Sequence, residues 1–216
     1  SVMVGSGCEW QLDPVTGRAR LVGVFAESTQ SFSRFIRPAN GRDYLATMSV
    51  DRHAALGKLV IYERLGPGDY RQRSAITSIG KEKRTILWAD ANGDGEHQPE
   101  EEVVQPVALN FYGYLCLSMY LGQDLTLYAS ETAETVDPAV RGGKPKIVTT
   151  RRLIALPVAE YTAAGAPRYD YLAAKVVPGI GVPSPDGKLV VGEVSVDRKT
   201  WVECWDLGSG QRCWAY

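Results

Sequence analysis

The segment VPSPDGKLVVGEVSVDRKTWVECWDLGSGQRCWAY, residues 182–216, decides the predicted fold. Its runs KLVVGEVSV and WVECWDL are rich in β-branched and aromatic residues and partly alternate between apolar and polar positions, which is typical of strands. PDG and GSG bound these runs, and both suit tight turns with a glycine at positive φ. The segment therefore predicts short strands joined by hairpin turns.

The same pattern recurs along the rest of the chain. Further strand-like runs are RLVGVF, DYLATMSV, KLVIYERL, YLCLSMYL, DLTLYAS and KIVTTRRLIALPV. Clusters of Gly, Pro, Asp and Asn separate them, as turn residues do. We therefore predict an all-β fold, and 216 residues suffice for one large domain or two small ones.

The spacing of the turns favours one all-β architecture. Candidate turns at Gly17, Gly68, Gly165 and Gly210 are about 48 residues apart, if the longest interval counts as two and contains a further turn at Gly122. A period in the forties with about four strands per unit is typical of β-propeller blades. We predict one β-propeller domain over residues 1–216, or a fragment of about four blades. A β-sandwich with evenly spaced hairpins is the alternative.

The final segment resembles a blade of the WD-repeat and quinoprotein-like β-propellers. Those families share a Ser-Pro-Asp-Gly-Lys start followed by Trp-Asp-Leu and a glycine turn. The matching residues here are Ser184, Pro185, Asp186, Gly187, Lys188, Trp205, Asp206, Leu207 and Gly210. The resemblance covers about 35 residues. Because the Gly-His pair of WD repeats is absent, it implies the propeller architecture and nothing narrower.

A second motif lies within residues 86–103, ILWADANGDGEHQPEEEV, which we treat as an insertion in the propeller. From Asp90 onward it follows the twelve-residue calcium loop of EF-hands, with oxygen ligands at alternate positions and a glycine at the sharp turn. The predicted metal residues are Asp90, Asn92, Asp94, Glu96 (through its carbonyl), Gln98 and Glu101. Glu101 is predicted to close the shell with two oxygens, so Ca²⁺ is the predicted cofactor.

The flanks of this loop differ from those of an EF-hand. A strand-like run precedes it, and Pro99 followed by EEEVVQPV does not begin a good helix. The loop therefore resembles the calcium loops of dockerins and of propellers with EF-like insertions. That resemblance implies a structural ion and no sensing role. An exposed NGDG turn with a charged tail, binding no metal, is the alternative.

Cysteine placement predicts one disulfide. Cys204 and Cys213 flank the last hairpin, and if residues 207–210 form its loop, the two cysteines face each other across it. Two buried thiols are the alternative. The partners of Cys8 and Cys116 stay open. A disulfide and a weak calcium site both require surroundings outside the cytoplasm, so we predict an extracellular or periplasmic location.

Catalytic motifs are absent from the sequence. His97 lies within the acidic loop, and His53 lies beside two charged residues in a loop, where histidines are more often surface groups than bases. Five tryptophans, Trp10, Trp88, Trp201, Trp205 and Trp214, could stack on sugars but more often fill a core. We therefore predict a secreted, calcium-stabilised, non-catalytic binding or assembly module. Part of a propeller enzyme acting on carbohydrate or in redox chemistry is the alternative.

Composition limits the classes of partner that we expect. The formal net charge of −1 gives no attraction toward nucleic acid, and the longest apolar runs are far shorter than the roughly 20 residues that span a bilayer. The chain opens within a strand-like run and ends after another, which leaves blade faces exposed. We therefore expect a protein partner, or the remainder of a precursor, against the end that carries Trp205 and Trp214. Carbohydrate is a second partner class.

Overall fold

The structure is a computed structural model, and it describes residues 2–5, 7–25, 32–38, 40–51, 56–110, 119–137, 146–178, 181–184, 186–196 and 199–216. Its regular elements are strands and three short 3-10 helices: η1 (Gly80–Glu82), η2 (Pro99–Glu101) and η3 (Tyr171–Ala173). The predicted all-β class is confirmed. No helix in the described ranges is long and apolar enough to cross a membrane.

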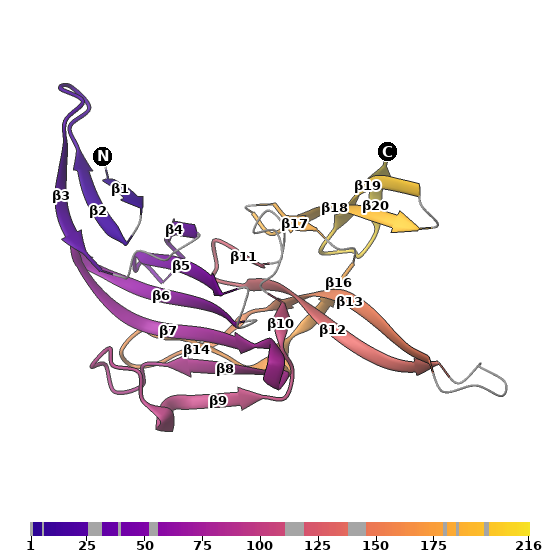
Figure 1. Ribbon diagram of the computed structural model, residues 1–216. Coiled ribbons are helices and arrows are strands. Elements are labelled where there is room, and N and C mark those ends of the chain that lie inside the picture. The colour runs from indigo at the N-terminus through magenta and orange to yellow at the C-terminus, as the bar shows by residue number, and fades with distance from the viewer. Residues whose placement is uncertain are drawn as a thin grey trace.

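The first half of the chain forms two antiparallel sheets (Figure 1). The N-terminal sheet contains β1 (Val2–Gly5), β2 (Cys8–Leu12) and β3 (Ala19–Val24). The six-stranded sheet contains, in chain order, β4 (Phe32–Ile36), β5 (Tyr44–Asp51), β6 (Leu56–Gly66), β7 (Asp69–Ile79), β8 (Arg84–Ala89) and β9 (Glu102–Gln105). Strands that follow one another along the chain are neighbours in both sheets, so short turns make nearly all the connections.

The second half forms three smaller units. The five-stranded sheet contains β10 (Leu109–Asn110), β11 (Met119–Leu121), β12 (Leu127–Asp137), β13 (Lys146–Leu156) and β16 (Lys175–Val177). A separate hairpin is made of β14 (Val158–Tyr161) and β15 (Pro167–Tyr169). The C-terminal sheet contains β17 (Val182–Pro183), β18 (Leu189–Val196), β19 (Lys199–Asp206) and β20 (Arg212–Ala215).

The predicted turns are confirmed, but the predicted equal repeat is wrong. Turns at Gly17, Gly68, Gly122, Gly165 and Gly210 each join two strands that pair with each other. The sheets, however, hold three, six, five, two and four strands. A hairpin turn marks one strand pair and does not reveal how many pairs share a sheet. Only the C-terminal sheet has the four strands expected of a blade, and no closed ring of sheets forms among the described residues.

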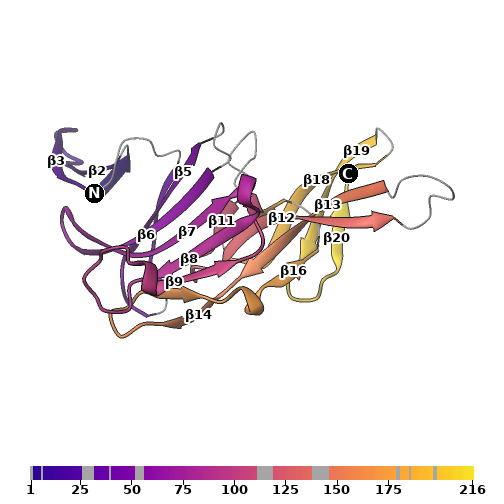
Figure 2. The same cartoon turned by 60° about the horizontal axis from the view of Figure 1, so that its bottom comes forward.

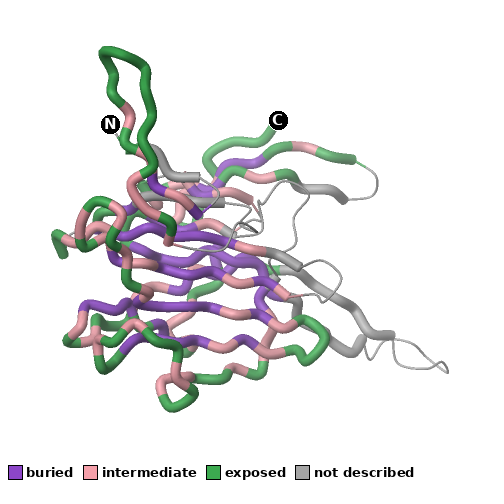
Figure 3. Tube along the Cα trace, turned by 60° about the vertical axis from the view of Figure 1, so that its left-hand side comes forward, coloured by how far each residue is buried: buried purple, intermediate pink, exposed green. Residues whose placement is uncertain are grey.

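The larger sheets pack on one another in chain order, which Figure 2 shows as a row from the N-terminal to the C-terminal sheet. Residues of β12 alternate between two cores, as the period of a strand requires. Leu127 and Ala129 belong to the core shared with the six-stranded sheet, whereas Tyr128 belongs to the core shared with the C-terminal sheet. In the latter core Tyr128 is joined by Val190 and by the half-buried Trp205. The five-stranded sheet is therefore covered on both faces. Figure 3 shows the buried strands of the six-stranded sheet, which contributes to the first of these cores.

The N-terminal sheet packs on the six-stranded sheet near the β6–β7 turn. Phe25 lies against Tyr62 and Tyr70, with ring centroids 5.7 and 4.6 Å apart. Beside them the backbones of Gly23 and Gly68 cross so closely that a Cβ on Gly23 would lie 2.7 Å from the Gly68 Cα atom. Glycine at this crossing is required by the contact between two backbones.

Candidate metal site

The predicted calcium loop, residues 90–101, joins β8 to β9 at one end of the six-stranded sheet (Figure 1). It starts at Asp90, which is fully buried, and ends in the 3-10 turn Pro99–Glu101. Gly93 and Gly95 have φ values of 88° and 77°. The positive angle at Gly95, position 6 of the motif, permits the sharp turn that the motif needs there.

Three of the predicted ligands come together in the middle of the loop. The Asn92 Nδ2 group donates to Asp94 Oδ2 at 2.9 Å and to Gln98 Oε1 at 3.0 Å. The Gln98 Nε2 group also donates to Asp94 Oδ2, at 2.7 Å. These contacts bring side chains from loop positions 3, 5 and 9 to one point. Each of them offers an oxygen of the kind that Ca²⁺ binds.

Backbone hydrogen bonds set the curl of the loop. The Asp94 N–H donates to Asn92 Oδ1 at 2.9 Å, and the Glu96 N–H donates to Asp94 Oδ1 at 2.7 Å. The Glu96 bond, followed by contacts with Asn92 and Gln98, lowers the pKa of the Asp94 carboxyl. Asp94 therefore stays anionic at neutral pH. The Glu96 side chain is exposed, consistent with its predicted use of the carbonyl alone.

Asp90 is held by a buried cation. Its Oδ2 atom accepts from Arg73 NH1 at 2.5 Å, and its Oδ1 atom accepts from the Gly93 N–H at 2.7 Å. Arg73 also donates through Nε to Glu63 at 2.8 Å, and Glu63 accepts from Arg42 at 2.5 Å. Positive and negative side chains thus alternate from Arg42 to Asp90, and the last three are each at most 5% exposed. Sequence reasoning missed this network.

A β-bulge aims Arg73 into this network. Ile61 pairs with Ser74 and Tyr62 pairs with Gln72, so Arg73 is the extra residue between two register pairs. A bulge re-aims the side chain of its extra residue, and here that side chain reaches toward the start of the loop. Nothing in the sequence around Arg73 marks the bulge.

Glu101 fastens the end of the loop to its beginning. Its Oε1 atom accepts from the N–H groups of Ala91 and Asn92 at 2.8 and 3.2 Å, and its Oε2 atom accepts from Trp88 Nε1 at 2.9 Å. His97, predicted to be a non-ligand, lies against the Trp88 ring and contacts Glu102 Oε1 at 2.7 Å. The structure therefore gives Trp88 and Glu101 a shared role in closing the loop.

The oxygen ligands of the loop fit a calcium ion in part. A carboxylate has about four lone-pair positions, so Asp90 Oδ1 keeps one after accepting from Gly93. Glu101 already accepts three hydrogen bonds, two of them on Oε1. Binding of the ion through both of its oxygens therefore requires at least one hydrogen bond from the backbone to break. The carboxylates of Asp90, Asp94 and Glu101 each accept hydrogen bonds from a different set of groups. Among the described residues, no three His, Cys, Asp or Glu side chains form a group able to hold a metal.

The last hairpin differs from its predicted register by one residue. Trp205 pairs with Arg212 as expected, but Cys204 pairs with Trp214, and Cys213 is the extra residue of a β-bulge. The prediction that Cys204 and Cys213 sit directly opposite each other is wrong because hairpin counting assumes a regular ladder. Cys204 and Cys213 are both thiols in the structure, and the disulfide stays a prediction. Cys116 and His53 lie outside the described residues.

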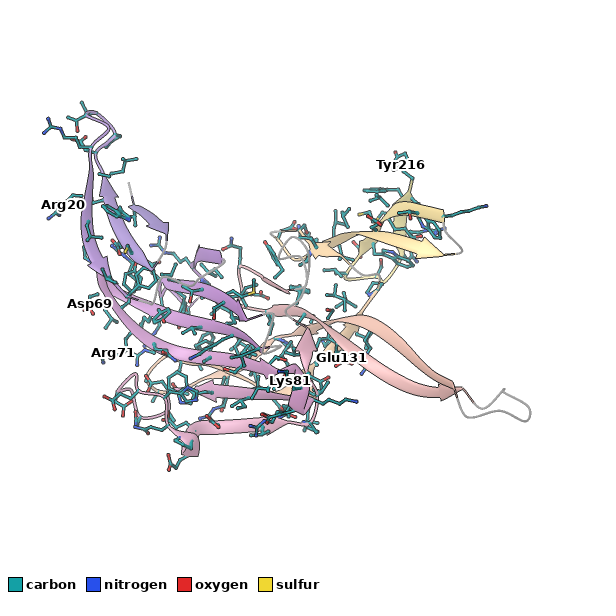
Figure 4. All side chains as sticks on the ribbon, viewed as in Figure 1. Arg20, Asp69, Arg71, Lys81, Glu131 and Tyr216 are labelled. Atoms are coloured by element: carbon teal, nitrogen blue, oxygen red, sulfur yellow. The ribbon has the colours of Figure 1, made fainter. Side chains whose placement is uncertain are left out.

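The tryptophans occupy different environments. Trp88 is buried at 1% exposure. Trp205 packs on the five-stranded sheet. It is therefore not part of an open end, contrary to the expectation that it and Trp214 form one partner surface. Trp214 is 39% exposed and its ring lies 5.3 Å from that of Tyr216, which Figure 4 shows at the outer edge of the molecule.

A cleft of about 390 Å³ lies where the N-terminal, six-stranded and five-stranded sheets meet. Its lining includes Val2, Ile36, Arg37, Asp43, Arg64 and Gln123. Arg37 pairs with Asp43 and Arg64 pairs with the buried Glu9, so the charges at the cleft balance. No sequence signal marks it, since its walls come from four distant segments. The volume suits a small ligand, but the paired charges select no ligand class.

Comparison with known proteins adds no relative. A scan against protein-family models finds no match, and no curated protein matches the chain.

Proposed function

We propose that this chain is a non-catalytic binding module with propeller-like sheet packing, in which the 90–101 loop binds one structural Ca²⁺ ion. The observation that carries the proposal is the convergence of Asn92, Asp94 and Gln98 within a loop whose two ends are joined by Glu101. The ion would add a cation to a segment in which three of the six predicted ligands already contact one another. Its role is to hold a long loop against the sheet edge.

Sheet packing supports the propeller part of the proposal. A β-sandwich has two sheets and one core between them. Here a central sheet is covered on both faces by its neighbours in chain order, and the N-terminal sheet packs on the six-stranded sheet in turn. Successive face-to-face packing is how propeller blades are arranged.

Calcium is expected to bind at a dissociation constant of about 10⁻⁴–10⁻³ M. At 10 mM Ca²⁺ the thermal midpoint is expected to rise by about 3–10 °C, since the ion binds only the folded loop. Asp94→Ala removes the carboxylate on which both amides converge and is expected to abolish this shift. Isothermal titration calorimetry and differential scanning calorimetry measure the two quantities. Asp90→Ala is a poor test, because it also removes one of the two carboxylates that pair with the buried Arg73.

The matched control is Glu100→Ala, which changes an exposed carboxylate of the same loop at a position that supplies no ligand. It is expected to bind Ca²⁺ like the parent chain. No heat of binding and no midpoint shift in the parent would sink the calcium proposal. Arg73 and the hydrogen bonds of the loop would then hold it without an ion.

The binding part of the proposal rests on the open face of the C-terminal sheet. Val191, Val202, Trp214 and Tyr216 are 39%, 40%, 39% and 87% exposed. Their pairings place them on one face: Cys204 lies opposite Trp214 and Val191, and Val202 exchanges backbone hydrogen bonds with Tyr216. The opposite face of this sheet is covered by the five-stranded sheet. A further β-sheet with an apolar face is the partner that this surface fits best.

The chain purified under native conditions is expected to sediment above its own 23.6 kDa. Trp214→Asp is expected to shift it toward the monomer, because a charge at the centre of the apolar face opposes burial. Val15→Asp, at a 90% exposed turn position away from this face, is the control and is expected to change nothing. A parent chain that sediments as a monomer and unfolds cooperatively speaks against the partner surface.

Location follows from the same proposal. A site with this affinity fills only where calcium is near millimolar, which places the protein outside the cytoplasm, in an extracellular or periplasmic setting. Failure of the calcium titration would remove this argument.

A further inference from the structure

The last hairpin places two cysteines on one face at its bulge. In a β-bulge, two residues of one strand lie opposite a single residue of the other. Cys204 pairs with Trp214, and the register shift leaves Cys213 as the residue added next to that pair. Cys213 therefore stands close to Cys204 although the two are not a register pair.

The two thiols are near enough to influence each other. The Cys213 thiol contributes, after burial, to the raised pKa of the Cys204 thiol. Cys213 also reaches the carbonyl of Gln211 with its Sγ atom at 4.0 Å. A disulfide needs Cβ atoms about 3.5–4.5 Å apart. Bond formation therefore requires the bulge to bring the Cβ atoms of Cys204 and Cys213 within that range.

The two cysteines differ in access to solvent. Cys204 is 1% exposed, whereas Cys213 is an exposed residue of the edge strand β20. Burial, with a contribution from the neighbouring thiol, raises the pKa of Cys204. The thiolate is the reactive form in exchange chemistry, so Cys213 is the one that an oxidant in solution meets first.

We propose that Cys204 and Cys213 form a reversible disulfide site that fastens the edge strand β20, with Cys213 reacting first. The Cys213 thiolate attacks one sulfur of a low-molecular-weight disulfide, forms a mixed disulfide and releases one thiol. The Cys204 thiolate then attacks the Cys213 sulfur, closes the bond and releases the second thiol. Two protein thiols and one small disulfide thus become one protein disulfide and two small thiols.

The expected consequence is a stapled hairpin. The four residues of β20 are all exposed and form one edge of the C-terminal sheet. Joining residues 204 and 213 closes a short loop in the unfolded chain, which raises the thermal midpoint by about 5–10 °C. The aromatic residues Trp214 and Tyr216 follow the bond directly, so the oxidised form holds them more firmly to β19.

Trypsin provides a direct assay. Cleavage after Lys199 and Arg212 places Cys204 in TWVECWDLGSGQR and Cys213 in CWAY. The full chain is equilibrated with oxidised glutathione in EDTA, which keeps calcium out of the result, and the peptides are mapped by mass spectrometry without reduction. We expect these two peptides to be linked, and the link and the midpoint shift to disappear on reduction.

Cys213→Ser changes an exposed residue and is expected to fold like the parent while losing both the link and the shift. Cys8→Ser is the matched control and is expected to keep both. The proposal is overturned if the parent stays reduced, if it retains glutathione on Cys213 alone, or if Cys204 or Cys213 is linked to Cys8 or Cys116. A link formed without any midpoint shift overturns the proposed fastening of β20.

Discussion

Arg73→Met is expected to lower the free energy of unfolding by about 3–5 kcal/mol, the largest loss predicted for any single substitution in this chain. Met keeps most of the volume and removes the charge. Glu63 and Asp90, exposed by 5% and 0%, would lose their shared cation in a place that water does not reach. Glu63 would keep only Arg42, and Asp90 Oδ2 would keep no donor among the described residues.

Urea unfolding followed by tryptophan fluorescence measures this loss, since Trp88 is buried on the neighbouring strand. Arg71→Met is the matched control: Arg71, labelled in Figure 4, lies two residues earlier on β7 and is exposed. We expect it to cost less than 1 kcal/mol. In the background of Glu63→Gln and Asp90→Asn, Arg73→Met should cost much less than in the parent. Equal costs for Arg71→Met and Arg73→Met would show that the network contributes little.

Glu9 is expected to make the fold sensitive to acid. Its carboxylate is 1% exposed and accepts from Arg64 at 2.8 and 3.0 Å, from the Gly68 N–H at 3.2 Å and from the Tyr70 hydroxyl. The bonds from Arg64, outweighing the effect of burial, lower the pKa of Glu9 from 4.5 to about 2. The folded state therefore binds this proton less readily than the unfolded state does.

A depressed carboxyl pKa stabilises the fold above pH 4.5, and this stabilisation is lost as the pH falls from 4.5 toward 2. The loss attributable to Glu9 between pH 6 and pH 2.5 is about 2–3 kcal/mol. Urea unfolding at the two pH values measures it as the difference between the parent and Glu9→Gln. Glu160→Gln, in an exposed ion pair, should behave like the parent. Parallel pH dependences for the parent and Glu9→Gln would contradict the prediction.

The strands and turns could be predicted because their signals are local. Alternation along β18 and β19 and the glycine at each turn follow from a few neighbouring residues. The number of strands in each sheet could not be predicted. Pairing between successive hairpins depends on contacts between segments, and no single stretch of sequence contains them. The six strands β4–β9 run from Phe32 to Gln105, which is longer than one of the turn intervals of about 48 residues that suggested equal blades.

The metal loop shows the same division. The contacts among Asn92, Asp94 and Gln98 join positions that the twelve-residue motif marks as ligands, and the calcium site itself stays a prediction. The ion pair between Asp90 and Arg73 could not be predicted, since it depends on a bulge opposite Ile61 and Tyr62. The bulge at Cys213 escaped prediction for the same reason: one unpaired residue changes which side chains meet without changing the composition of the strand.

The packing of each sheet on its neighbour in chain order has a consequence for how the protein is made. Most strand pairs join segments that are adjacent in the sequence, so a ribosome-bound chain can complete one sheet before the next has been synthesised. Each finished sheet then offers a template for the following one, as in repeat proteins whose folding propagates from unit to unit. In such a process the exposed face that carries Trp214 and Tyr216 is the surface on which a further sheet would pack. Covering that face would end the addition of sheets.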